Sequence, residues 1–241
     1  MNDIAFRISH LQIRVRDIAT AVEDLRYEGF DVDWRTDAPN AFIWFDEGPF
    51  LELFTTMDRL RFITPVMGLL FGRPMGRRFA AWVDAPDGLC DIVIIPRDEK
   101  LAHPDQLGRC RAVVEAIPGV RGTRVMQSSR ASTIDGSRIR FSFMALDPLA
   151  LPLVASAYDI PQNPGNCAHP NGARGVDWVA REFTDTEWMQ VTALLGEAPE
   201  RLRRSGFLPA ADFSLIGLDH QVVTCGVTIA PGEIQETIRQ N

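Results

Sequence analysis

The stretch SHLQIRVRDIATAVEDL, residues 9–25, carries the signal of a β-strand followed directly by that of an α-helix. Apolar residues at positions 11, 13 and 15 alternate with the polar His10, Gln12 and Arg14, as in a strand with one buried face. Asp17 is a favourable N-cap, and apolar residues then recur at helical spacing as far as position 25. The pattern therefore predicts a strand and a helix, with His10 on the polar face of the strand.

The residues that follow predict three further strands. The segments are GFDVDW (29–34), with the composition of a short strand, and AFIWFDEGPFLELFTT (41–56), with the pattern of a hairpin. In the second hairpin strand, Glu52 shares a face with Phe50 and Phe54. Residues 1–56 are thus expected to form a βαβββ unit.

The same order is expected a second time, and part of it a third time. The predicted elements are a helical connector (57–76), a strand (79–83), a helix (104–116), three strands (122–129, 137–146 and 151–158), a strand (174–182), a helix (185–195) and one or two strands within 213–229. The segment between the second and third units, 159–175, is rich in proline, asparagine and glycine, which indicates a long structured loop. Loops of this length within compact domains are often functional.

Composition and charge argue against several classes of function. The net charge of −7, the pI near 5.1 and the lack of a basic run are not typical of a nucleic-acid surface. The four cysteines form no CxxC pair, which argues against zinc or disulfides and favours a cytoplasmic location. No run approaches the roughly 20 apolar residues of a membrane span, and no glycine-rich phosphate loop, GxSxG or HExxH motif is present. We expect a cytoplasmic protein whose partner is a small molecule.

Charged residues on apolar strands are the first candidates for a site. Glu52 lies between two aromatic side chains, where a buried carboxylate is costly without a partner. It is expected to bind a metal ion, to act as a general base with a raised pKa, or to pair with an arginine. Arg138 and Arg140 share one face of the strand at 137–146. If the opposite, apolar face packs on a helix, both line the same cavity and bind an anionic group; otherwise they neutralise Glu52 or face solvent.

His169 is a further candidate, in a His-Pro-Asn-Gly turn. Pro170 restricts the backbone before it and Gly172 permits a positive φ, so the turn is stiff enough to aim a side chain. The alternative is a structural turn in which Asn171 caps the loop.

Three segments in order resemble the glyoxalase-like branch of the vicinal oxygen chelate superfamily: 9–25, FIWFDEGPFLELFT (42–55) and HPNGARG (169–175). The resemblance implies an α+β fold in which paired βαβββ modules form a cup-shaped mixed sheet, to which this chain adds a partial third module at the C-terminus. The expected units are residues 1–160, with modules at about 1–56 and 79–158 joined by the helical connector, and residues 161–241, with the HPNG loop and the partial third module packed on the first two.

The resemblance also implies a position for a metal ion. In metal-dependent members, the first and fourth strands of each module supply ligands for a divalent ion. Carried over to this sequence, the first module offers His10 and Glu52. The corresponding strands of the second module, 79–83 and 153–158, offer alanine, tryptophan and serine, which are poor ligands. His169 in the loop would then complete the metal site, or His220 in the late strand would do so if the chain folds back.

Three functions remain open at this point. The first is a glyoxalase-like lyase, isomerase or dioxygenase that acts on a small, oxygen-rich, anionic substrate, with His10 and Glu52 as catalytic residues. The alternative is a metal-free protein that binds or sequesters a small molecule, as resistance members of the superfamily do. The third is a scaffold for self-assembly, for example as a homodimer. The predicted substrate-binding residues are Arg138, Arg140, Trp44, Phe50, Phe54 and Trp82.

Overall fold

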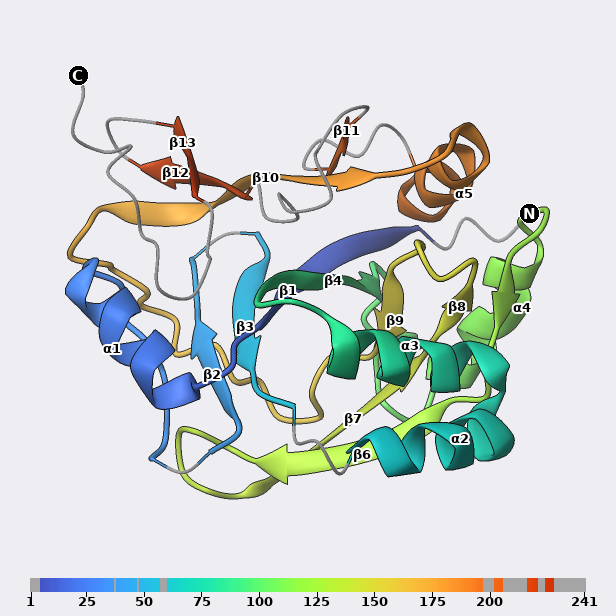
Figure 1. Ribbon diagram of the computed structural model, residues 1–241, viewed down its shortest axis with the longest axis horizontal. Helices are drawn as coiled ribbons and strands as arrows, with labels where there is room; N and C mark the ends of the chain where they lie inside the picture. Colours follow the sequence, from blue (N-terminus) through green and yellow to red (C-terminus); the bar gives the residue numbers. More distant parts are fainter. Residues whose placement is uncertain are drawn as a thin grey trace.

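The computed structural model of the chain describes residues 5–36, 38–46, 48–56, 60–196, 202–205, 216–220 and 224–227. Its central feature is a curled, seven-stranded mixed sheet that forms a half-barrel (Figure 1). The strand order is β2-β3-β1-β4-β9-β7-β6, and the described residues also include five α-helices. The predicted α+β class and the curled mixed sheet are thereby confirmed.

The first half of the sheet contains the strand and helix that the opening stretch predicts. Its elements are β1 (Phe6–Arg14), α1 (Ile18–Tyr27), β2 (Asn40–Ile43) and β3 (Phe50–Phe54). β1 runs parallel to β3, which pairs antiparallel with β2. Asp17 caps α1, since its carboxylate accepts a hydrogen bond from the Thr20 N–H at 2.8 Å. The strand expected at 29–34 is reduced to a single bridge between Asp33 and Phe42.

The second half of the sheet begins later than predicted. Two helices come first, α2 (Leu60–Phe71) and α3 (Arg73–Asp84), followed by β4 (Gly88–Pro96). The strand predicted at 79–83 is wrong, because these residues belong to α3. Pro74 lies in the first turn of this helix, where its missing N–H costs nothing, and Met75, Phe79 and Trp82 recur at helical spacing and pack in one cluster. The true first strand, β4, pairs antiparallel with β1 and parallel with β9.

The other elements of this half differ from the prediction mainly in their bounds. They are η1 (Leu107–Cys110), α4 (Arg111–Glu115), β5 (Arg121–Gly122), β6 (Met126–Ala131), β7 (Arg138–Met144), β8 (Leu146–Asp147) and β9 (Leu153–Ala155). The helix expected at 104–116 is thus a 3-10 turn followed by one short helix. β6 pairs antiparallel with β7 and places Arg130 opposite Ile139. β5 and β8 form a separate two-stranded sheet.

The two faces of the large sheet are covered by different elements. Leu11 and Ile13 point to the convex face and belong to the main core, together with buried side chains of α1, α4 and α5. The concave face of the second half packs on α2 and α3 through side chains such as Met75 and Phe143. His10 alternates with Leu11 and therefore points to the concave face of the first half.

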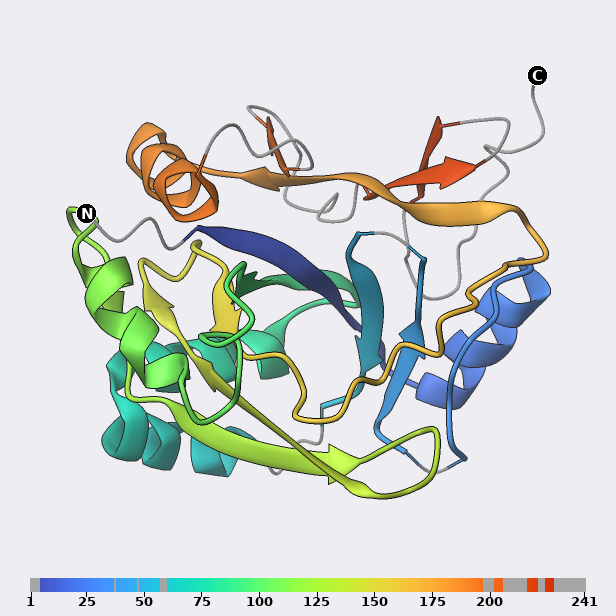
Figure 2. The ribbon, with the colours of Figure 1, turned by 180° about the vertical axis from the view of Figure 1, so that it is seen from behind.

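The C-terminal region forms a smaller sheet that lies along β1 in both ribbon views (Figures 1 and 2). Its elements are β10 (Ala173–Glu182), α5 (Asp185–Leu195), β11 (Leu202–Ser205), β12 (Ile216–His220) and β13 (Thr224–Val227), in the order β11-β10-β12-β13. The helix predicted at 185–195 is confirmed, and a capping box between Thr184 and Glu187 starts it. The remainder of the strand segment expected within 213–229 lies outside the described residues. None of the described helices is long and apolar enough to cross a membrane.

Candidate functional site

His10 and Glu52 meet on the concave face of the first half of the sheet. They stand on the parallel strands β1 and β3, with His10 opposite Phe50 and Gln12 opposite Glu52. His10 Nε2 lies 3.2 Å from Glu52 Oε2, and only 9% and 8% of the two residues is exposed. The sequence-based expectation that strand alternation points both side chains to one face is confirmed.

Three donors surround the Glu52 carboxylate. Besides His10, Asn40 donates from Nδ2 to Oε1 at 2.7 Å, and Gln12 donates from Nε2 to Oε2 at 3.4 Å. Burial acts to raise the pKa of Glu52, but the hydrogen bonds from His10 and Gln12 and the charges of His10 and Arg130 outweigh it and hold the pKa below its ordinary value. The prediction of a raised pKa for Glu52 is therefore wrong, and this residue is an ionised acceptor at neutral pH.

An ionised carboxylate sets the tautomer of the histidine beside it. A carboxylate only accepts, so the Nε2 of His10 carries the hydrogen that points to Glu52. In the neutral ring Nδ1 is then the acceptor, and the Ser9 hydroxyl lies 3.1 Å from it. The pairing of β1 with β4 is irregular between Ile8 and His10, which is where Ser9 lies. His10 is thus held from one side by Glu52, and its basic nitrogen is directed away from that carboxylate.

Aromatic side chains line the surroundings of this pair. The Phe50 ring stacks on His10 with a centroid distance of 4.6 Å, and the Trp44 ring lies 4.3 Å from that of Phe50. Phe42 continues the row at 5.3 Å from Trp44, and Tyr158 packs against the same cluster. We refer to Phe42, Trp44, Phe50 and Tyr158 as the aromatic wall. Trp44 and Phe50 were predicted here, whereas Phe42 and Tyr158 were missed.

Arg130 of β6 also belongs to this region, although it was not among the predicted site residues. Its guanidinium carbon lies 4.3 Å from the centroid of the Phe42 ring and 4.7 Å from that of Tyr158. Its charge acts on both Glu52 and Tyr158. Strand pairing could have indicated Arg130. In the antiparallel β6–β7 pair it lies opposite the apolar Ile139, on the face of the sheet away from Arg138 and Arg140.

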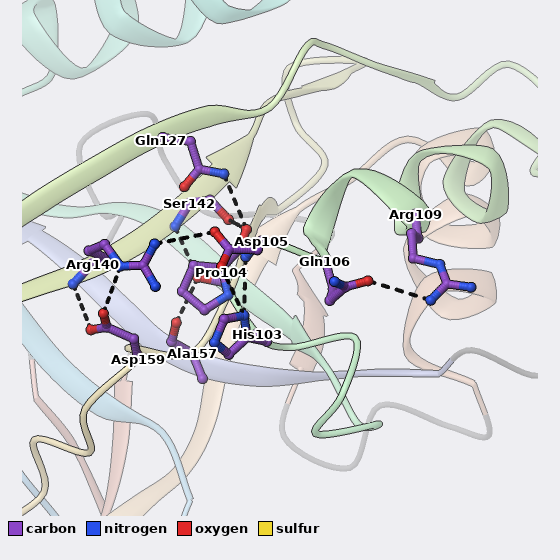
Figure 3. Close-up of polar contacts among 11 residues, drawn as sticks. His103, Pro104, Asp105, Gln106, Arg109, Gln127, Arg140, Ser142, Ala157 and Asp159 are labelled. Carbon is purple, nitrogen blue, oxygen red and sulfur yellow. Dashed lines mark hydrogen bonds and ion pairs between the residues drawn. The ribbon is translucent and has the colours of Figure 1, made fainter.

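The predicted position of Arg138 and Arg140 in the cup is wrong. Both are exposed on the other face of β7, where they line an open depression of about 550 Å³ with Asp105 and residues of β6. Figure 3 shows Arg140 held between two carboxylates, with Asp159 at 2.9 Å and Asp105 at 3.4 Å. The Arg138 Nε donates to the Ser129 hydroxyl at 2.9 Å. The expectation failed because the apolar face of β7 packs inward, on α2 and α3.

The second half of the sheet does contain a carboxylate on the concave face. Asp91 of β4 lies opposite Gln12, but Arg78 of α3 donates to it at 2.5 Å and Trp82 Nε1 donates at 2.9 Å. Arg78 and Asp91 are 1% and 2% exposed, and Arg181 lies 3.5 Å from the same carboxylate. The predicted wall residues Phe54 and Trp82 meet here at 6.3 Å, in this second group. Helix α3 therefore covers the concave face of the second half and pairs the carboxylate there through Arg78 and Trp82.

His169 does not join His10 and Glu52. Its Nδ1 accepts from the Asp31 N–H at 3.0 Å, and its Nε2 lies 2.9 Å from the carbonyl oxygen of Trp44, to which it donates. Burial lowers the pKa of His169, so the neutral ring is favoured. With both ring nitrogens bonded to backbone, the predicted role as a metal ligand is not supported. Its neighbour Asn171 donates to the Glu28 carbonyl at 3.0 Å, and the motif fastens the long loop to the end of α1.

The donors present do not fit a complete metal site. The 3.2 Å between His10 Nε2 and Glu52 Oε2 would suit two ligands of one ion. Among the described residues, however, no group of three His, Cys, Asp or Glu side chains is placed to hold a metal. Both Glu52 oxygens already accept hydrogen bonds, and Asp91 is neutralised by arginine. What the arrangement does provide is a histidine oriented by a fixed carboxylate.

Comparison with known proteins does not identify the chain. No family model matches it, and no curated protein matches its sequence. The geometry of the His10–Glu52 site is therefore the basis on which we propose a function.

Proposed function

We propose that the protein is a glyoxalase-like enzyme that moves a proton on a small, oxygen-rich, anionic substrate without a bound metal ion. His10 is the general base, and Glu52 is the residue that orients it. The observation that carries the proposal is the set of three donors on Glu52, which leaves this carboxylate ionised and directs the other nitrogen of His10 away from it.

The chemistry follows from these roles. A substrate C–H or O–H takes the place of the Ser9 hydroxyl at His10 Nδ1 and gives up its proton there. The imidazolium that forms is stabilised by Glu52, which keeps its negative charge throughout. The aromatic wall limits the access of water and so strengthens this charge interaction. Proton abstraction next to a carbonyl group is the reaction class that suits one base, because the electron pair of the broken C–H bond moves onto the carbonyl oxygen to give an enolate, which then takes a proton back from the imidazolium.

The order of strands supports a paired-module version of the fold. In the first half β1 neighbours β3, and β3 neighbours β2; in the second half β4 neighbours β9, then β7, then β6. Each half has a parallel pair followed by antiparallel pairs. We propose that each half is one module of the βαβββ type, the first with its second strand reduced to the Asp33–Phe42 bridge and the second starting at β4. On this proposal the catalytic pair His10 and Glu52 lies in the first module, and α2 and α3 fill the concave face of the second module.

The proposal is tested by proton exchange in D₂O. Phenylpyruvate is a suitable probe, because it combines an aromatic ring, a carboxylate and an acidic C–H next to a carbonyl. Loss of its C3 proton signal is followed by NMR with the wild type, His10→Gln and the control His103→Gln, which changes an exposed histidine. We expect exchange above the buffer rate, a loss on the order of 10²- to 10⁴-fold in His10→Gln, and no loss in the control. Wild-type exchange at the buffer rate, or full activity of His10→Gln, would refute the proposal.

A metal-free binding protein is the second candidate function. It is favoured by the aromatic wall, which offers stacking surfaces with ring centroids 4.3 to 5.3 Å apart. This candidate predicts binding of an aromatic ligand, seen as a change in Trp44 fluorescence, with no exchange above the buffer rate. The same probe therefore separates the two functions.

A further inference from the structure

Two nitrogen atoms of the Arg130 side chain have no hydrogen-bond partner within the described part of the chain. Its Nη1 donates to the carbonyl oxygen of Ala131 at 3.1 Å, whereas Nε and Nη2 are buried and have no partner among the residues that the structure describes. Buried donors are normally paired, and an unpaired one costs free energy. In the guanidinium group, Nε–H and one N–H of Nη2 lie on the same edge and point in the same direction. This edge is the one that binds a carboxylate or phosphate with two parallel hydrogen bonds.

Two aromatic rings contact this guanidinium group. Phe42 and Tyr158 lie over it at 4.3 and 4.7 Å from the guanidinium carbon. The guanidinium contacts both rings by cation–π interactions, and its buried Nε/Nη2 edge is where a ligand can add hydrogen bonds once that edge is uncovered. Because Phe42 lies opposite Glu52 in the β2–β3 pair, the Arg130 edge belongs to the same site as the His10–Glu52 pair.

We propose that Arg130 is the anion-binding residue of this site and that its Nε/Nη2 edge takes the carboxylate of a small aromatic acid. The inference rests on the proposed function and names its class of substrate. A carboxylate is favoured over a phosphate dianion, because the single charge of Arg130 balances one negative charge and ionised Glu52 repels a second. The aromatic wall supplies the stacking surface for the ring of the acid.

Entry of the acid requires part of the wall to move. Tyr158 lies after the end of β9 and is only partly buried, whereas Phe42 is 1% exposed, so Tyr158 is the ring that the proposal requires to turn aside. Burial and the charge of Glu52 raise the pKa of Tyr158, which keeps its hydroxyl neutral and able to donate to the bound carboxylate.

The test compares probes that differ only in the anionic group. Binding of 3-phenylpropionate, 3-phenylpropionamide and 2-phenylethylphosphonate to the full chain is measured by isothermal calorimetry. The variants are Arg130→Met, which keeps an unbranched side chain between the two rings, and the control Arg138→Met, an exposed arginine on the neighbouring strand. The wild type and the control are expected to bind the carboxylate at least about tenfold more tightly than the amide, with the phosphonate weaker than the carboxylate. In Arg130→Met this preference is lost, while the affinity for the amide stays the same.

Three results would overturn the inference: equal affinity of the wild type for acid and amide, no binding of either probe, or a preference that survives in Arg130→Met. A phosphonate bound more tightly than the carboxylate would reassign the site to phosphate ligands and overturn the substrate class. The exchange assay distinguishes a failure of the Arg130 inference from a failure of the proposed function. Carboxylate-specific binding without exchange refutes only the catalytic role of His10, and exchange without carboxylate preference refutes only the role of Arg130.

Discussion

Replacement of Asp91 by asparagine is expected to destabilise the protein strongly, because it leaves buried arginine charge without a counter-ion. Asp91 accepts from Arg78 at 2.5 Å and lies 3.5 Å from Arg181. Removal of one partner of a buried ion pair typically costs about 3–5 kcal/mol. Arg78 keeps the carbonyl oxygens of Leu149 and Leu151 as acceptors, so we expect a loss near the lower end, about 3 kcal/mol. In a chain of this size that lowers Tm by roughly 6–12 °C.

The matched control is Asp84→Asn, at the end of the same helix that carries Arg78. Asp84 pairs with Arg61 at a similar distance, 2.6 Å, but the two side chains are 61% and 63% exposed. Exposed pairs contribute about 1 kcal/mol or less. Urea unfolding followed by circular dichroism gives the free energy of unfolding for the wild type and both variants. An equal loss in the free energy of unfolding for the two variants would refute the expectation that the buried Arg78–Asp91 pair stabilises the packing of α3 on the sheet.

Three further predictions concern the site and the loop beside it. Because the pKa of His169 is lower in the folded protein, the unfolded chain binds a proton more readily at this residue. The free energy of unfolding should therefore fall as the pH drops from about 6.5 toward the lowered pKa. His169→Gln should flatten this part of the pH profile of Tm. Ser9→Ala should keep phenylpyruvate exchange within a few-fold of the wild type, since the substrate displaces this hydroxyl; a loss of 10³-fold or more would instead make Ser9 a nucleophile. Glu52→Gln should lower exchange and leave 3-phenylpropionate binding intact or stronger, because Arg130 loses its negative neighbour; weaker binding would contradict this.

Local signals in the sequence were sufficient for some parts of the fold. The alternation in residues 9–16 and the Asp17 cap predicted β1 and α1, and the pattern of residues 185–195 predicted α5. The placement of His10 and Glu52 on one face also followed from alternation alone. In each case the pattern of one element determines which of its side chains are buried.

The errors arose where burial depends on what covers a strand. The apolar face of β7 was expected to pack on an outer helix, which would have turned Arg138 and Arg140 inward. Instead α2 and α3 fill the concave side of the second half, so the apolar face of β7 points to that side. Arg130 of β6 lies on the same face, because it pairs with Ile139. The error at residues 79–83 has another cause, since a short apolar run does not by itself distinguish a helix from a strand.

The most direct test of the central claim is to measure metal content and phenylpyruvate exchange on the same sample, before and after treatment with a chelator. The account predicts metal well below one equivalent per chain and an exchange rate that chelation does not change, because His10 acts as a base oriented by Glu52. The account would be contradicted by one equivalent of a divalent metal that chelation removes together with the activity. If His10→Ala and Glu52→Ala also fail to bind that metal, the pair holds a metal ion.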